Sequence, residues 1–261
     1  MFSNAPRCRY RKNQLGEVIC QLRFPEILTI ETTLPDEFQE AIRAFFPQYS
    51  SRKEAAAPKL TGTPGNLKLE PQRQITNHQF LSEDRMWRVN LTSTFISLSC
   101  SKYTCWEDFA RMLDQPLAAF IKIYRPAYFE RVGLRYLNFI SRKELDLQHL
   151  PFRALFQSQY LGLLEDEEVQ ETTAARSTVD AELAIRGGCR VKLHAGPGLV
   201  KRAAQDDKEV RFIFDQDLYM PGKVEVSYSA GALETLHTQA DAIFRGAITD
   251  TLHAAMEPET I

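Results

Sequence analysis

The stretch YFERVGLRYLNFI, residues 128–140, decides how this chain folds. Val132 and Leu134 fall on one face of an extended chain, and Arg131 and Arg135 fall on the opposite face. A period of two residues over such a length is typical of a half-buried strand in a sheet with one face on the core. The stretch therefore predicts a long strand with its arginines on the face opposite its apolar residues.

An earlier strand repeats part of this pattern. Residues 17–24, EVICQLRF, alternate in the same way, and Leu22-Arg23-Phe24 lies 112 positions (134 − 22) before Leu134-Arg135-Tyr136. Each strand is followed by a helix that begins with a Leu-Pro dipeptide, then by several further strands and a long amphipathic helix. The shared order predicts an internal duplication, with halves 1–126 and 127–261 joined in one continuous domain.

Helical spacing of apolar residues marks the two long helices. One follows a capping box, Thr104 to Glu107, and Pro116 should kink or split it. The other, about residues 229–256, is the longest in the chain. We therefore expect an α+β fold, in which two strand-helix-strands-helix units form one curved, mostly antiparallel sheet with long helices on one face. This order of elements is analogous to helix-grip and TATA-binding-protein-like folds, although fold alone does not fix function.

Composition narrows the class of protein and the compartment in which we expect it. Of 261 residues, 44% are hydrophobic and 25% are charged, which is typical of a globular chain. The five cysteines form no regular framework, no apolar run is long enough to cross a bilayer, and the N-terminus does not look like a secretory signal. We therefore expect a cytoplasmic protein that does not bind membranes. The net charge of −2 disfavours general nucleic-acid binding.

One block of the sequence, between Trp87 and Asn138, carries a family likeness. The resembling motifs there are Tyr103-x-x-Trp106-x-x-Phe109 and Arg131-Val132-Gly133-Leu134-Arg135-Tyr136-x-Asn138, with Leu22-Arg23-Phe24 and Asp215-x-Asp217-x-Tyr219 elsewhere. In these motifs the chain resembles a sporadically distributed family of bacterial proteins of about this length and of uncharacterised function. The resemblance implies one module of bacterial type, and it implies no particular chemistry.

Three arginines are the candidate ligand-binding residues. Arg131 and Arg135 share a strand face, and Arg23 holds the equivalent place in the first half. If the halves share a sheet, Arg23 and Arg135 could approach each other and bind a carboxylate or phosphate. The alternative is that each arginine pairs with a neighbouring acid such as Glu17 or Glu130.

Metal and catalytic motifs are sparse. Asp215 and Asp217 share a strand face and could hold a divalent cation such as Mg²⁺, but a third ligand is not evident, and acids facing solvent explain the pattern equally well. No zinc, nucleotide-binding or serine-hydrolase motif occurs, so no cofactor is expected. His237 and Asp241, at i and i+4, favour a surface hydrogen bond. The aromatic stripe of residues 104–124 indicates core packing, with the lining of a cavity between helix and sheet as the alternative.

These observations favour a non-catalytic binding module that recognises a small anionic ligand or a protein partner. The first alternative is a metal-dependent hydrolase or nuclease that uses Asp215 and Asp217. A second alternative is a subunit of a larger assembly, with the last helix as its docking surface, and a homodimer also stays open.

Overall fold

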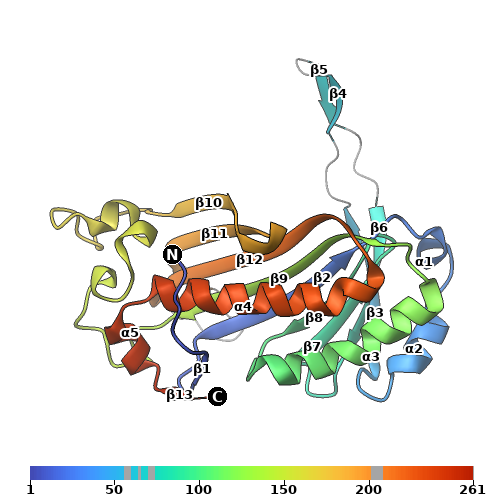
Figure 1. Ribbon diagram of the computed structural model, residues 1–261, viewed down its shortest axis with the longest axis horizontal. Helices are drawn as coiled ribbons and strands as arrows, with labels where there is room; N and C mark the ends of the chain where they lie inside the picture. The colour runs from blue at the N-terminus through green and yellow to red at the C-terminus, as the bar shows by residue number, and fades with distance from the viewer. Residues whose placement is uncertain (56–59, 64–65, 70–73, 201–207, 261) are drawn as a thin grey trace.

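The computed structural model describes residues 1–55, 60–63, 66–69, 74–200 and 208–260. Within these residues, nine strands form one sheet (Figure 1), and each strand is antiparallel to its neighbours. The spatial order is β10 (Val179–Ala184), β11 (Arg190–Leu199), β12 (Val210–Val224), β9 (Phe129–Ile140), β2 (Leu15–Arg23), β8 (Phe95–Cys100), β7 (Trp87–Leu91), β6 (Gln74–Leu81) and β3 (Gln48–Ala55). The antiparallel sheet and its helices confirm the α+β class.

Two short ribbons lie outside this sheet. The strand β1 (Cys8–Tyr10) pairs with β13 (Pro258–Thr260), so that segments near the two ends of the chain meet. A second ribbon joins β4 (Leu60–Thr63) to β5 (Asn66–Leu69) and projects away from the sheet (Figure 1).

The two strands that the sequence marks most clearly are neighbours at the centre of the sheet. In the register of β2 and β9, Cys20 lies opposite Leu134 and Leu22 lies opposite Val132. All four side chains are fully buried, at 0% exposure. The predicted alternation is therefore confirmed, and it fixes which face of the sheet meets the core.

The long helices cover that buried face. The helix α4 (Ser229–Ala247) lies along β9 and β12, and α3 (Trp106–Tyr124) packs on β8 (Figure 1). The described residues also form three shorter α-helices: α1 (Leu28–Thr32), α2 (Asp36–Ile42), which packs against α3, and α5 (Asp250–Ala255). In the described part of the chain, no helix combines the length and the apolar character needed to cross a membrane.

The start and the course of α3 differ from the prediction. The capping box does not form, because the helix begins one residue later, after Cys105, and the Thr104 hydroxyl donates to the Asp108 carboxylate at 2.9 Å. Pro116 does not split the helix. It removes one backbone hydrogen bond, but burial of the neighbouring Leu113 and Leu117 against the core holds the helix together.

The predicted helix 229–256 is in fact two helices, so a single long helix is wrong. Ile248 is extended, with φ −93° and ψ 153°, and Thr249 caps α5. At the break, the segment around Phe156 supplies backbone partners: Gln157 donates to the Ala247 carbonyl at 2.8 Å. Contacts from a distant segment thus replace the helical hydrogen bonds, which helical periodicity alone cannot reveal.

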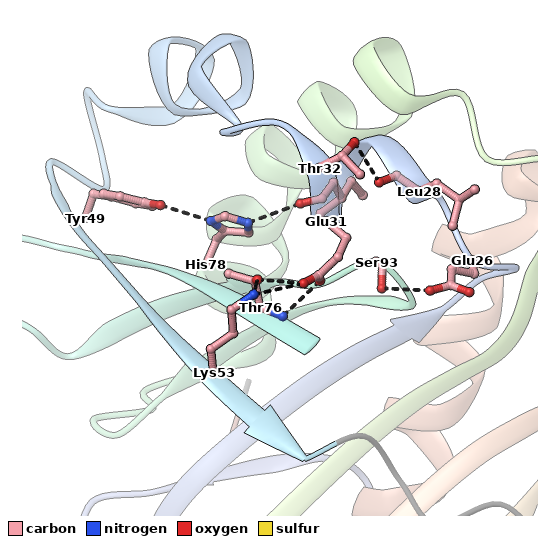
Figure 2. Close-up of polar contacts among 10 residues, drawn as sticks. Glu26, Leu28, Glu31, Thr32, Tyr49, Lys53, Thr76, His78 and Ser93 are labelled. Atoms are coloured by element: carbon pink, nitrogen blue, oxygen red, sulfur yellow. Dashed lines mark hydrogen bonds and ion pairs between the residues drawn. The ribbon is translucent and has the colours of Figure 1, made fainter. Parts of the chain in front are cut away.

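A partly buried polar network ties α1 to the sheet (Figure 2). The Glu31 carboxylate accepts from the Thr76 backbone at 2.9 Å, from the Thr76 hydroxyl at 2.8 Å and from Lys53 at 3.1 Å. His78 donates from Nε2 to the Ile30 carbonyl at 3.2 Å, so its Nδ1 accepts from the Tyr49 hydroxyl at 3.0 Å. Each of these groups has a partner, which indicates a structural role for the network.

We predict that Glu31→Ala lowers the free energy of unfolding by roughly 1–3 kcal/mol, because it removes three bonds to a carboxylate and leaves the Thr76 N–H without a partner. Denaturant titration measures the change. The control is Glu37→Ala, an exposed glutamate on α2, which should change the value by less than about 0.5 kcal/mol. Equal effects of the two substitutions would contradict the role of Glu31 as an anchor.

Candidate functional site

Two of the three predicted arginines, Arg131 and Arg135, meet the predicted aspartates on the sheet face that the helices leave uncovered. Arg131 donates to both carboxylate oxygens of Asp217, at 2.6 and 2.8 Å. Arg135 donates to the two oxygens of Asp215, at 2.8 and 2.5 Å. Arg135, Asp215 and Asp217 line a shallow, open depression together with residues of β10 and β11. The two predicted sites are therefore one cluster of ion pairs.

Contrary to the prediction, Arg23 does not approach Arg135. The register of β2 and β9 places Arg23 opposite Arg131, whereas Arg135 lies opposite Ile19. Ile19 and Arg23 are four residues apart on β2, which separates the two positions by roughly 13 Å. Acidic partners for Arg131 and Arg135 exist, as the alternative proposed, but they come from β12 instead of Glu17 or Glu130. The three-arginine anion site stays a prediction, with two of its charges already matched.

The same ion pairs bear on the metal hypothesis. A cation at Asp215 and Asp217 would have to displace Arg135 and Arg131 from their carboxylates. Across the described ranges, no group of three or more His, Cys, Asp or Glu side chains is placed to hold a metal ion. The hydrolase reading stays a prediction, and the geometry does not favour it.

Gly133 makes room for one of the ion pairs. A Cβ built on this residue would lie 2.2 Å from Nη1 of Arg131. The guanidinium of Arg131 thus lies across the glycine, with its Cζ 4.6 Å from the centre of the Tyr219 ring. A glycine inside a strand often marks such a close approach.

A second candidate site, a cavity of about 90 Å³, lies between α4 and the buried face of the sheet. Its walls come from β1, the loop before α3, the strands β9 and β12, α4 and Met256 at the end of α5. The β1–β13 ribbon brings segments near the two ends of the chain to this site (Figure 1).

Polar side chains are buried around the cavity without full hydrogen bonding. Gln216 is 2% exposed and His237 is 6% exposed. His237 Nδ1 lies 2.8 Å from the Tyr136 hydroxyl. The Gln216 Oε1 and His237 Nε2 atoms have no hydrogen-bond partner among the residues that the structure describes. Buried polar atoms are rarely left in this state unless water or a ligand completes them.

Asp241 lies one helical turn after His237 and also lines the cavity. Burial raises the pKa of Asp241, and the positive charge of Arg7 opposes this shift only in part. Burial, assisted by the charge of Arg7, lowers the pKa of His237 to about 3. The expected surface hydrogen bond between His237 and Asp241 is wrong, because His237 is buried and contacts Tyr136 instead.

Aromatic rings form much of the remaining wall. The Trp106 ring stacks on His237, with centroids 4.6 Å apart and planes 11° apart, and its Nε1 donates to Glu234 at 2.6 Å. Phe109 packs in the core, as predicted for the aromatic stripe on α3, whereas Trp106 also lines the cavity, which lies beneath α4 and not between α3 and the sheet.

The site residues that the prediction missed carry a readable signal. Gln216 has the same strand phase as Phe214 and Leu218, and Asn138 has the same phase as Leu134 and Tyr136. A polar residue in the phase of the core marks a position where the buried face must satisfy hydrogen bonds. The prediction concentrated on the opposite phase, where the charges lie.

Comparison of the chain with models of known families finds no match, and comparison with curated proteins finds no similar sequence. The resemblance to an uncharacterised bacterial family therefore stays a prediction.

We predict that Gly133→Ala displaces Arg131 and lowers the free energy of unfolding by roughly 1 kcal/mol, because the new methyl group occupies the place of the guanidinium. A double-mutant cycle with Arg131→Gln tests the mechanism by denaturant titration. If Gly133→Ala acts through Arg131, the second substitution should add almost nothing. Additive costs would show that the glycine serves another purpose.

We predict that His237 makes stability depend on pH in the acidic range. The folded protein keeps this ring neutral down to about pH 3, whereas the unfolded chain binds a proton near pH 6.5. The contribution of the neutral His237 ring to the free energy of unfolding is therefore complete above pH 6.5. It is lost as the pH falls below that value, by up to about 1.4 kcal/mol per pH unit.

The measurement is the free energy of unfolding at pH 7 and pH 5. His237→Gln should reduce the difference between the two values, while His149→Gln, at an exposed histidine, should leave it unchanged. An unchanged difference in His237→Gln would rule out a buried neutral ring.

Proposed function

We propose that the protein is a non-catalytic binding module that holds a small ligand in the cavity beneath α4. The observation that carries this proposal is the pair of buried polar atoms, Gln216 Oε1 and His237 Nε2, left without partners in the described structure. An unsatisfied buried polar group costs about 1–3 kcal/mol. A bound ligand that reaches these atoms would recover that free energy, and both residues line the cavity.

Binding fits the cavity better than catalysis does. A histidine with a pKa near 3 is a weak general base at neutral pH. Burial raises the pKa of the Cys8 and Cys105 thiols, which disfavours the reactive thiolate. These groups suit recognition by hydrogen bonding.

We also infer that the halves 1–126 and 127–261 are related by a pseudo-twofold axis through the β2–β9 pair. The order β2-β8-β7-β6-β3 on one side of that axis resembles β9-β12-β11-β10 on the other. Gln21 and Gly133 lie opposite each other and are 112 positions apart (133 − 21), the offset of the sequence repeat. This symmetry supports the helix-grip or TATA-binding-protein-like layout, with helices on one face and an open face behind them.

Anion recognition on the open face is a second candidate function. Arg23 lies opposite Arg131, whose charge Asp217 already matches, so Arg23 would be the counter-charge for an anion on this face. Arg23 is exposed and makes no side-chain ion pair with any residue that the structure describes. An anionic small molecule or an acidic segment of a protein partner would match this position.

Ligand retention distinguishes the two sites. The purified protein is incubated with the small-molecule fraction of a cell extract, desalted and denatured, and the released compounds are identified by mass spectrometry. We predict that the wild-type protein retains at least one compound. Ala240→Leu should retain about one tenth of that amount or less, because the larger side chain occupies the cavity.

Two variants serve as controls for this experiment. Ala230→Leu makes the same change at an exposed position of α4 and should retain the compound. Arg23→Ala should also retain it. A compound lost from Arg23→Ala but kept by Ala240→Leu would move the site to the open face, and no difference among the four proteins would contradict both sites.

A further inference from the structure

We propose that residues 3–9 form a strap that lifts from the cavity beneath α4 and controls access to it. The strap lies between two aromatic side chains, Phe2 and Tyr10, which pack against the core. Three of its residues line the cavity: Arg7, Cys8 and Arg9. The inference concerns entry to the cavity and so goes beyond the proposed binding function.

The strap is the weakly packed wall of the cavity. No residue of the strap, which the structure describes throughout, is buried, whereas the opposite wall contains the buried side chains Tyr136 of β9 and Ala240 of α4. Local opening of a folded protein begins where few apolar groups are buried and where hydrogen bonds are exposed to solvent. The strap meets this description and the opposite wall does not.

The contacts that hold the strap down are polar. Ser3 donates its backbone N–H to the Ala242 carbonyl of α4 at 2.9 Å. Arg7 and Arg9 both contact the single carboxylate of Glu107 on α3, at 3.5 and 3.4 Å. These three side chains are between 33% and 52% exposed, so their ion pairs are weak. The ribbon of β1 with β13 adds backbone hydrogen bonds, and β13 is exposed along its whole length.

Both ends of the strap are fixed more firmly. At the first end the chain crosses α4 closely (Figure 1), since a Cβ on Gly246 would collide with the Met1 carbonyl oxygen. At the other end the Tyr10 hydroxyl lies 2.8 Å from Nδ1 of His253, and the Tyr10 ring packs edge-on against Phe244. The strap can therefore lift between two attached ends while the sheet and α4 stay folded.

Cysteine labelling measures this opening, because Cys105 lines the cavity and is 7% exposed. The full chain, carrying Cys8→Ser, is mixed with iodoacetamide, and mass spectrometry follows the modification of Cys105 and Cys20. Cys20 is 0% exposed at the centre of the sheet and reports unfolding of the whole protein. We predict that Cys105 reacts at least roughly tenfold faster than Cys20, because lifting the strap costs less than unfolding.

Two variants test whether the strap is the gate. Ser3→Pro removes the N–H that donates to Ala242 and should speed the labelling of Cys105 by roughly threefold or more. The double variant Arg7→Gln/Arg9→Gln removes both ion pairs and should speed it by roughly twofold or more. Added salt should speed labelling in the parent protein through the same ion pairs, and it should do so much less in the double variant.

The arginine variant cannot act by making the thiol more reactive. Burial raises the pKa of Cys105 and the charge of Arg9 opposes that shift, so loss of Arg9 alone would slow the labelling. The matched control is Arg43→Gln/Arg52→Gln, which removes two exposed ion pairs outside the cavity walls and should leave the rate unchanged.

Equal labelling rates of Cys105 and Cys20 would overturn the inference, since the cavity would then open only when the protein unfolds. Fast labelling of Cys105 that neither strap variant changes would also overturn it, because the reagent would enter by another route. If Ser3→Pro labels Cys20 quickly, the variant is unfolded and the arginine variant decides. No ligand takes part, so failure here leaves the proposed function to the ligand-retention experiment.

Discussion

The pairing of β2 with β9 is the constraint on which the rest of the structure depends. It places Cys20 and Leu22 beside Leu134 and Val132 at the centre of the sheet. Because side chains alternate along a strand, a slip of one residue would exchange the two faces. The register therefore decides that Tyr136 lies beneath α4, while the arginines of β9 lie on the opposite face. Both candidate sites follow from this one arrangement.

The polar side chains at the two ends of the helix-covered face differ in how completely they are hydrogen-bonded. Beneath α1, Glu31 and His78 have partners for their polar atoms, and the result is a closed structural network. Beneath α4, Gln216 Oε1 and His237 Nε2 have no hydrogen-bond partner among the described residues, and both residues line a cavity. A fold bears such a cost when the groups serve binding, because satisfying them within the protein would remove the site.

Sequence patterns predicted the features that depend on local periodicity. The central strands, the α+β class and the helices over one face of the sheet could be predicted, since burial imposes a period of two or 3.6 residues. The break after Ala247 and the ion pairs of Arg131 and Arg135 could not, because they depend on residues distant in the sequence. The cavity was missed for the same reason: its walls come from both ends of the chain and from the middle.

The central claim is that a ligand completes the polar groups beneath α4, and a high-resolution crystal structure of the protein as purified from cells tests it most directly. The account predicts density for an organic molecule in the cavity, within hydrogen-bond distance of Gln216 Oε1 and His237 Nε2. A cavity in which both atoms bond only to protein groups or ordered water would contradict it.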